Sequence, residues 1–294
     1  MRSEQQMHAL ILDVAKSDER VRAVFMNGSR ANPAAQKDIF MDYDIVYVVN
    51  ATAPFRAQPA WVDVFGERLV MQTPDEMDAA LGCPADVERC CGYLMQFADG
   101  NRIDLRLMTP ERAREECKAD SQTVGLLDKD GLLPPLPPPS DAAYHIQRPT
   151  QMAFGACCNE FWWTAPYAAK GLWRGRLTYA LDVMNSYARP QLLQMLSWQA
   201  GAGTGFAVSA GKCGAALPAY LPADVWKAYL ATYCGANEAE VWAALFLMAE
   251  LFLKTARAVA AQCELSFSEG EAHGSMAYLA RVRTLPRDAA AIFE

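Results

Sequence analysis

A glycine-serine turn followed by two closely spaced aspartates constrains this chain more than any other feature. The apolar run over residues 21–26 predicts a strand that leads into Gly28 and Ser29, which offer close backbone approach, N–H donors and a hydroxyl to a phosphate. Further along, Asp42 and Asp44 begin a second apolar run, and alternate residues of a strand lie on one face. Two carboxylates held this close repel each other unless a cation lies between them, and oxygen ligands suit Mg²⁺ that shares substrate phosphates. The pattern therefore predicts a sheet that carries a magnesium and phosphate site.

A third carboxylate is expected on a neighbouring strand. The alternating runs over residues 93–97 and 102–108 flank an Asp-Gly pair, which is a strong hairpin signal. The apolar residues of the second run share one face, so Asp104 lies on the other face, toward a polar surface or cleft. A solvated face with Arg–Asp pairing would give the same pattern. Together with Asp42 and Asp44, however, a set of three catalytic carboxylates is the stronger interpretation.

With these residues placed, the chain resembles the aminoglycoside 6-adenylyltransferases, the streptomycin adenylyltransferase group within the DNA polymerase β-like nucleotidyltransferases. The segments over residues 28–32 and 42–45 are typical of the whole superfamily. The Asn-Glu-Phe-Trp segment (residues 159–162) and the Lys-Gly-Leu segment (residues 170–172) are more specific to this group. The resemblance covers most of the chain, up to about residue 262, and is not followed beyond Cys263. The segments that carry it are residues 28–32, 42–45, 103–105, 127–130, 157–162, 170–172 and 211–212.

The chain is expected to have two parts and an α+β fold. A proline-rich segment cannot continue a helix or a central strand and predicts a semi-rigid linker over residues 134–149. Residues 1–133 are predicted to form a nucleotidyltransferase domain with a mixed β-sheet and flanking helices, and residues 150–294 an all-helical substrate-binding domain. A further strand is predicted over residues 68–72. Helices are predicted over residues 4–17, 150–163, 176–198, 223–233 and 237–262, with a short one that begins after Thr109. Pro166 and Pro190 are expected to kink or break their helices.

The resemblance implies transfer of AMP from ATP to a hydroxyl of streptomycin, at its 6-position, with release of pyrophosphate and resistance to the antibiotic. Asp42 and Asp44 would hold Mg²⁺ on the ATP phosphates, and Asp104 would join them as a ligand or act as the base. Glu160 is the first candidate for the base, with Asp104 as its rival, and it is also a candidate substrate contact; a solvated helix glutamate is the alternative reading. Tyr167 is expected on the same helix face as Glu160.

Several other residues are candidates for binding. Gly28, Ser29, Arg30, Lys37 and Lys212 are predicted to contact the nucleotide, although Lys212 could be an ordinary surface loop lysine.

Asp182 lies in a mostly apolar helix, so it is expected either to be paired inside the protein or to contact a cationic drug.

Composition agrees with an enzyme of this kind. The net charge of −7 and the lack of a visible basic stripe argue against a nucleic-acid partner, whereas an acidic protein attracts polycations such as aminoglycosides. No apolar run has the roughly 18–20 uncharged residues of a membrane helix, and no signal peptide is visible. Nine cysteines without framework spacing predict reduced thiols and a cytoplasmic location.

Two alternatives stay open. One is a nucleotidyltransferase for another small molecule, such as a lincosamide or a sugar, and the other is a non-catalytic nucleotide-binding or antitoxin-like module. The sequence does not assign an oligomeric state.

Overall fold

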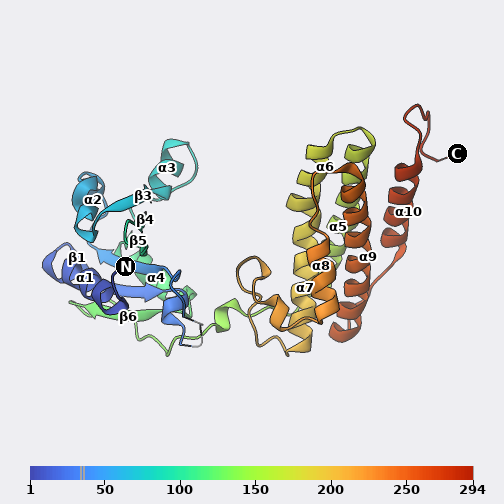
Figure 1. Cartoon of the computed structure of the whole chain (residues 1–294). Coiled ribbons are helices and arrows are strands. Elements are labelled where there is room, and N and C mark those ends of the chain that lie inside the picture. The colour runs from blue at the N-terminus through green and yellow to red at the C-terminus, as the bar shows by residue number, and fades with distance from the viewer. Residues whose placement is uncertain (34, 36, 294) are drawn as a thin grey trace. The chain divides into compact units, whose positions relative to one another are not determined.

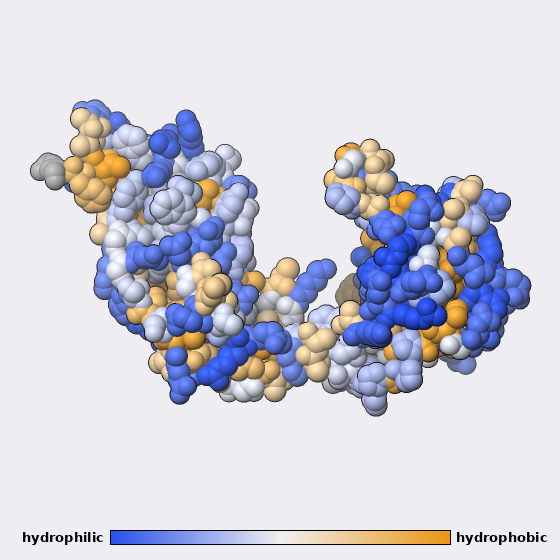
Figure 2. Space-filling view, turned by 180° about the vertical axis from the view of Figure 1, so that it is seen from behind, coloured by the Kyte–Doolittle hydropathy of each residue, from blue (hydrophilic) through white to orange (hydrophobic). Residues whose placement is uncertain are grey.

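The computed structural model describes residues 1–33, 35 and 37–293. The chain forms two compact units, Met1–Ala143 and Tyr144–Glu294. The first contains a sheet with flanking helices and the second is helical, so the predicted α+β fold is confirmed (Figure 1). Hydrophilic residues cover much of the visible face of each unit (Figure 2). Among the residues that the structure describes, no helix is both long and apolar enough to cross a membrane.

The sheet of the first unit has six strands in the order β3-β4-β5-β2-β1-β6. The strands are β1 (Val21–Asn27), β2 (Tyr43–Val49), β3 (Arg68–Gln72), β4 (Cys90–Phe97), β5 (Arg102–Met108) and β6 (Val124–Asp128). Only the pairing of β2 with β5 is parallel; the other neighbours are antiparallel. The sheet is therefore mixed, as the sequence predicts, but β6 was not predicted.

Helices cover both faces of this sheet. On one face, α1 (Glu4–Ser17) packs Met7 and Ile11 against the strands, and its first turn is closed by a capping box at Ser3. On the other face, α4 (Pro110–Ala119) packs Ala113 and Cys117. Because both faces are covered, β1 and β2 are buried over nearly their whole length. The short helices α2 (Ala53–Arg56) and α3 (Pro74–Ala80) complete the unit.

The proline-rich segment is irregular and packs on the first unit. Leu133 and Leu136 contact the cluster beneath α4, and the Ser140 N–H donates to the Ser121 carbonyl over 3.0 Å. The compact units divide just after it, between Ala143 and Tyr144.

The second unit is a helical bundle (Figure 1). Its helices are α5 (Gln151–Trp173), α6 (Leu177–Val183), α7 (Arg189–Gly203), α8 (Ala223–Ala231), α9 (Glu238–Cys263) and α10 (Gly270–Thr284). The Asn237 side chain caps α9 as its sequence suggests, because it accepts hydrogen bonds from two N–H groups of the first turn. The core lies among α5, α7 and α9, where Phe161 and Phe252 stack with ring centroids 3.9 Å apart.

Pro166 and Pro190, both expected to kink or break their helices, differ in outcome. Pro166 does not end its helix, because α5 continues through it for seven more residues, to Trp173. Helix interiors resist proline, but here Ala165, Ala168 and Ala169 around it are completely buried, so packing offsets the missing hydrogen bond. Near Pro190 the helix predicted over residues 176–198 is interrupted, as expected: α6 ends, Met184–Ala188 form a π-helical turn, and Pro190 lies in the first turn of α7. Helix α10 was not predicted.

Candidate active site

The two strands that were predicted to carry the catalytic carboxylates, β2 and β5, are neighbours in the sheet. In the parallel pair β2–β5, Asp44 is directly opposite Asp104, and in the antiparallel pair β1–β2 it is opposite Asn27. Neighbouring strands are about 4.8 Å apart, so these three residues form one row across the middle of the sheet. The structure thus brings Asp44 and Asp104 together although 60 positions separate them in the sequence.

The glycine-serine turn lies directly against this row. Gly28 has φ 75° and ψ −162°, a conformation essentially restricted to glycine. A Cβ atom at Gly28 would lie 2.2 Å from Oδ2 of Asp44, so a side chain there would displace the carboxylate. Ser29 is exposed and begins the 3₁₀ turn Ser29–Ala31. Because Gly28 has no side chain, the turn can lie in close contact with the Asp44 carboxylate, and a turn of this kind can offer backbone N–H groups to a phosphate.

The charge of this site is unbalanced. The pKa of Asp44 is raised from 3.8 to about 6, mainly by burial and also by the negative charges of Asp104 and Asp42. Arg102 offsets part of this charge. Its guanidinium donates to both carboxylate oxygens of Asp104, at 2.7 and 2.8 Å, and its Nε lies 3.6 Å from Oδ2 of Asp42. The Arg–Asp pairing that the alternative interpretation of β5 predicted is therefore present. It involves two of the three candidate catalytic carboxylates, Asp104 and Asp42.

The donor set fits Mg²⁺ by its chemistry. Among the described residues, no three His, Cys, Asp or Glu side chains are already arranged as a metal cluster. Asp42 and Asp44 nevertheless supply oxygen ligands only, and burial together with the charges of Asp104 and Asp42 raises the pKa of Asp44 more than Arg102 lowers it. A bound cation would remove this penalty. Asp104 could join as a ligand if Arg102 shared it.

Arg30 and Lys37, which were predicted to contact the nucleotide, are engaged within the first unit. The Arg30 side chain is only 8% exposed, stacks 3.8 Å from the ring centroid of Tyr43, and donates to the carbonyls of Met41 and Asp42 at 2.8 and 3.0 Å. Arg30 therefore holds the segment that leads into β2. Lys37 lies 3.2 Å from Glu4 on α1. Phosphate contacts of these two residues remain predictions.

Sequence reasoning missed a group of polar residues beside Asp44. The buried Asn27 accepts a hydrogen bond of 3.0 Å from Thr123, and Asp120 adds to the charge that raises the pKa of Asp44. Thr123 precedes β6, whose pairing with β1 brings this segment to the site. No local pattern marks it. For Arg102 a signal exists, because it lies two residues before Asp104 on the same strand face.

The remaining candidates belong to the helical unit. Glu160 and Tyr167 are both partly buried on α5, and the Thr164 hydroxyl donates to the Glu160 carbonyl over 2.8 Å. Asp182 is exposed on α6 and accepts a hydrogen bond of 3.1 Å from Ser186, so it is not paired in the interior. Lys212 is exposed in a short turn after Gly211. The structure places these four residues only within their own unit.

Comparisons with known proteins identify the family of this chain. The family model described as streptomycin adenylyltransferase matches residues 1–282, which extends the resemblance past Cys263 into α10. An aminoglycoside 6-adenylyltransferase of Campylobacter jejuni is 38% identical over 267 residues, 91% of each chain. One of Bacillus subtilis is 38% identical over 261 residues, 88% of this chain and 90% of the relative.

A solved structure is also similar. It is an aminoglycoside 6-adenyltransferase from Bacillus subtilis, 32% identical, with a TM-score of 0.48 and coverage of 97% of this chain and 100% of the other. The family match and the two curated relatives each span well over two thirds of the chain. The chain therefore belongs to the streptomycin adenylyltransferase family.

Proposed function

We propose that this protein transfers AMP from ATP to a hydroxyl of a streptomycin-like aminoglycoside, at the 6-position, and so confers resistance. The observation that carries the proposal is the row of Asp44 and Asp104 on β2 and β5, with the Gly28 turn directly against Asp44. A turn for phosphate next to paired carboxylates is what nucleotidyl transfer requires. The names of the curated relatives support an aminoglycoside as the acceptor.

The reaction can be assigned to this chain's own residues. The acceptor oxygen forms a bond to the α-phosphorus of ATP, the bond to the pyrophosphate oxygen breaks, and the hydroxyl proton goes to a carboxylate. Asp42 and Asp44 would hold Mg²⁺, which supplies charge neutralisation at the phosphates when bound. The turn at Gly28 and Ser29 would cradle the phosphates.

The proton acceptor is assigned to Glu160, with Asp104 as the alternative. Both oxygens of Asp104 accept hydrogen bonds from Arg102, so they are already engaged by a neighbouring side chain. Glu160 is half-buried on α5, in a segment specific to this group. Thr164 donates its hydrogen bond to the backbone carbonyl of Glu160 and not to the carboxylate. Lys212 is assigned to the triphosphate, while Tyr167 and Asp182 are assigned to the acceptor.

Charge supports a cationic acceptor. The net charge is −7, and Asp182 is exposed on a helix of the second unit. An acidic surface raises the local concentration of a polycation and speeds its association. The nine cysteines are free thiols, which supports a cytoplasmic location.

A pyrophosphate-release assay with ATP and Mg²⁺ tests the proposal. Streptomycin should release one pyrophosphate per AMP joined to the drug, whereas lincosamides and neutral sugars should release little. Asp44→Asn serves as the inactive control, with Asp13→Asn on the exposed face of α1 as the matched active one. Preference for a lincosamide would favour the other small-molecule class, and no release with any acceptor would favour a binding module.

A further inference from the structure

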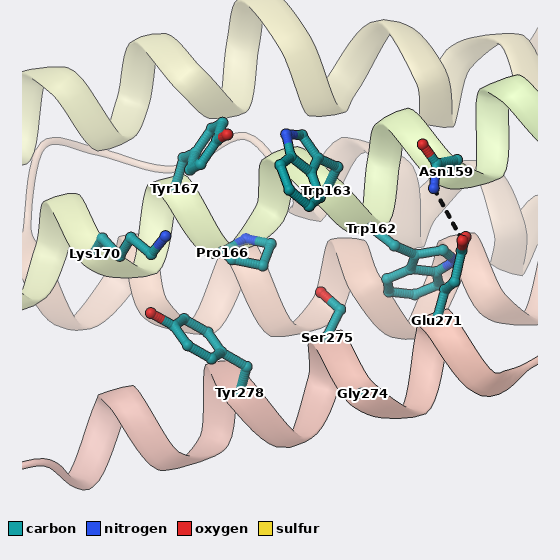
Figure 3. A pocket seen from close by; sticks show the side chains of 10 residues that line it. All are labelled: Asn159, Trp162, Trp163, Pro166, Tyr167, Lys170, Glu271, Gly274, Ser275 and Tyr278. Atoms are coloured by element: carbon teal, nitrogen blue, oxygen red, sulfur yellow. Dashed lines mark hydrogen bonds between the residues drawn. The ribbon is translucent and has the colours of Figure 1, made fainter. Parts of the chain in front are cut away.

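A cavity lies in the helical unit, between α5 and α10 (Figure 3). It has a volume of about 490 Å³, which is enough for a small ligand. Trp163, Tyr167 and Lys170 reach it from α5, while Ser275 and Tyr278 reach it from α10. Glu160, the proposed base, is not among the residues that line it.

Two polar groups in the wall of this cavity have no hydrogen-bond partner within the described part of the chain. They are the indole N–H of Trp162 and the hydroxyl of Ser275, in side chains whose residues are only 4% and 8% exposed. A buried donor without a partner costs free energy, and most such groups in folded proteins are satisfied. Both residues line the cavity, so a molecule bound there could supply the missing partner.

Ser275 differs from other helical hydroxyls of the same unit. Thr164, Ser197 and Thr255 each donate to the carbonyl four residues earlier, at 2.8 Å. This is the usual arrangement for a hydroxyl inside a helix. Ser275 does not make this bond although it lies in the interior of α10. Its hydroxyl thus remains available to a ligand.

The other walls combine aromatic rings with balanced charge. Trp163 is 64% exposed, and the Lys170 ammonium lies 5.1 Å and 5.7 Å from the ring centroids of Tyr167 and Tyr278. The Glu271 carboxylate accepts a hydrogen bond of 2.9 Å from Asn159, drawn as a dashed line in Figure 3. One ammonium and one carboxylate give the pocket no strong demand for a charged ligand. The aromatic faces suit the C–H faces of a ring, and the polar groups suit hydroxyls around its edge.

We propose that this α5–α10 pocket binds a polyhydroxylated six-membered ring, either a sugar or an aminocyclitol. Two sources supply such a ring. One source is a ring of the acceptor drug, and this assignment depends on the proposed function. The other source is a free sugar, and this assignment is independent of the proposed function.

The indole N–H signals of ¹⁵N-labelled full-length protein test the pocket without catalysis. Streptomycin and D-glucosamine are titrated separately, in the absence of ATP and Mg²⁺, and Trp162→Phe identifies the Trp162 signal. A saturable shift of this signal is expected with at least one probe, because the ligand accepts a hydrogen bond from the indole. A shift with streptomycin identifies the acceptor ring as the source, and a shift with glucosamine alone identifies a free sugar.

A matched pair of glycine variants locates the binding. Gly274 lines the pocket on α10 and Gly155 lies outside it on α5, and a Cβ atom at either would meet nothing within 4 Å. Gly274→Leu should fill the pocket and weaken binding at least tenfold, whereas Gly155→Leu should leave affinity within twofold. Trp162→Phe, which keeps a ring but loses the donor, should weaken binding several-fold when it is followed through the signals of the ligand.

Two results would overturn the pocket. One is a Trp162 signal that neither probe shifts, and the other is equal affinity in Gly274→Leu and Gly155→Leu. The pyrophosphate assay separates this failure from failure of the proposed function. Turnover of streptomycin with an unshifted Trp162 signal would contradict only the proposed binding pocket. A shifted signal without turnover would contradict only the proposed adenylyl transfer.

Discussion

Replacing Asp44 by asparagine should stabilise the first unit while abolishing activity. The folded structure raises the pKa of Asp44 from 3.8 to about 6, first through burial and then through Asp104 and Asp42. The difference of roughly two pH units corresponds to about 3 kcal/mol of free energy at high pH. Asparagine has a similar shape without the charge, so Asp44→Asn removes this penalty.

The sign of the pH dependence follows from proton binding. Below pH 3.8 the carboxyl is protonated in both states and contributes nothing. Between pH 3.8 and about 6 the folded state keeps a proton that the unfolded state loses, so the free energy of unfolding falls as pH rises. Above about pH 6 the full penalty is present. The stability advantage of Asp44→Asn should therefore grow by about 3 kcal/mol between pH 4 and pH 8.

Hydrogen exchange of backbone amides in β1 and β2 measures this advantage, because these strands form the buried centre of the first unit. It also avoids treating two units as a single unfolding transition. Asp13→Asn, at an exposed position of α1, is the matched control and should stay within about 0.5 kcal/mol of the wild type. Mg²⁺ should slow exchange in the wild type at pH 8 and have little effect in Asp44→Asn.

The reasoning is refuted if Asp44→Asn is no more stable than Asp13→Asn at pH 8. It is also refuted if the advantage does not change with pH. Near wild-type turnover of Asp44→Asn would contradict the nucleotidyltransferase assignment itself, because the variant empties the proposed metal site.

Three further changes test the remaining assignments. Gly28→Ala places a methyl group 2.2 Å from Oδ2 of Asp44 in a backbone region that costs about 1–3 kcal/mol, so both thermal stability and turnover should fall, and unchanged kinetics would contradict the close approach. Glu160→Gln should lower kcat by about 10²–10⁴-fold while ATP binding, measured by calorimetry, survives; a change below about threefold would assign the base to Asp104. Asp182→Asn removes an exposed carboxylate, and such charges contribute about 0–1 kcal/mol, so KM for streptomycin should rise by no more than about fivefold at low salt. That rise should vanish at high salt, and a rise that persists there would show a desolvated contact instead.

The sequence alone determined the local elements. An apolar run placed β2, period-two alternation placed β5 and put Asp104 on the face opposite the apolar residues, and Asn237 marked the start of α9. The Asp-Gly turn marked the β4–β5 hairpin. These signals succeed because each depends on residues only a few positions apart, within the range of backbone sterics and cap hydrogen bonds. The resemblance of the motifs also identified the family, which the comparisons confirmed.

Tertiary structure decided how these elements meet. The parallel register that aligns Asp44 with Asp104, the β6 pairing that brings Thr123 to Asn27, and the packing of α10 on α5 all join residues far apart in the chain. Register and packing depend on which surfaces bury each other, and a local pattern carries no information about its distant partner. The pKa of Asp44 has the same origin, because burial and neighbouring strands raise it. The residue types of the site could thus be read along the chain, but their charge balance arises only when the sheet is assembled.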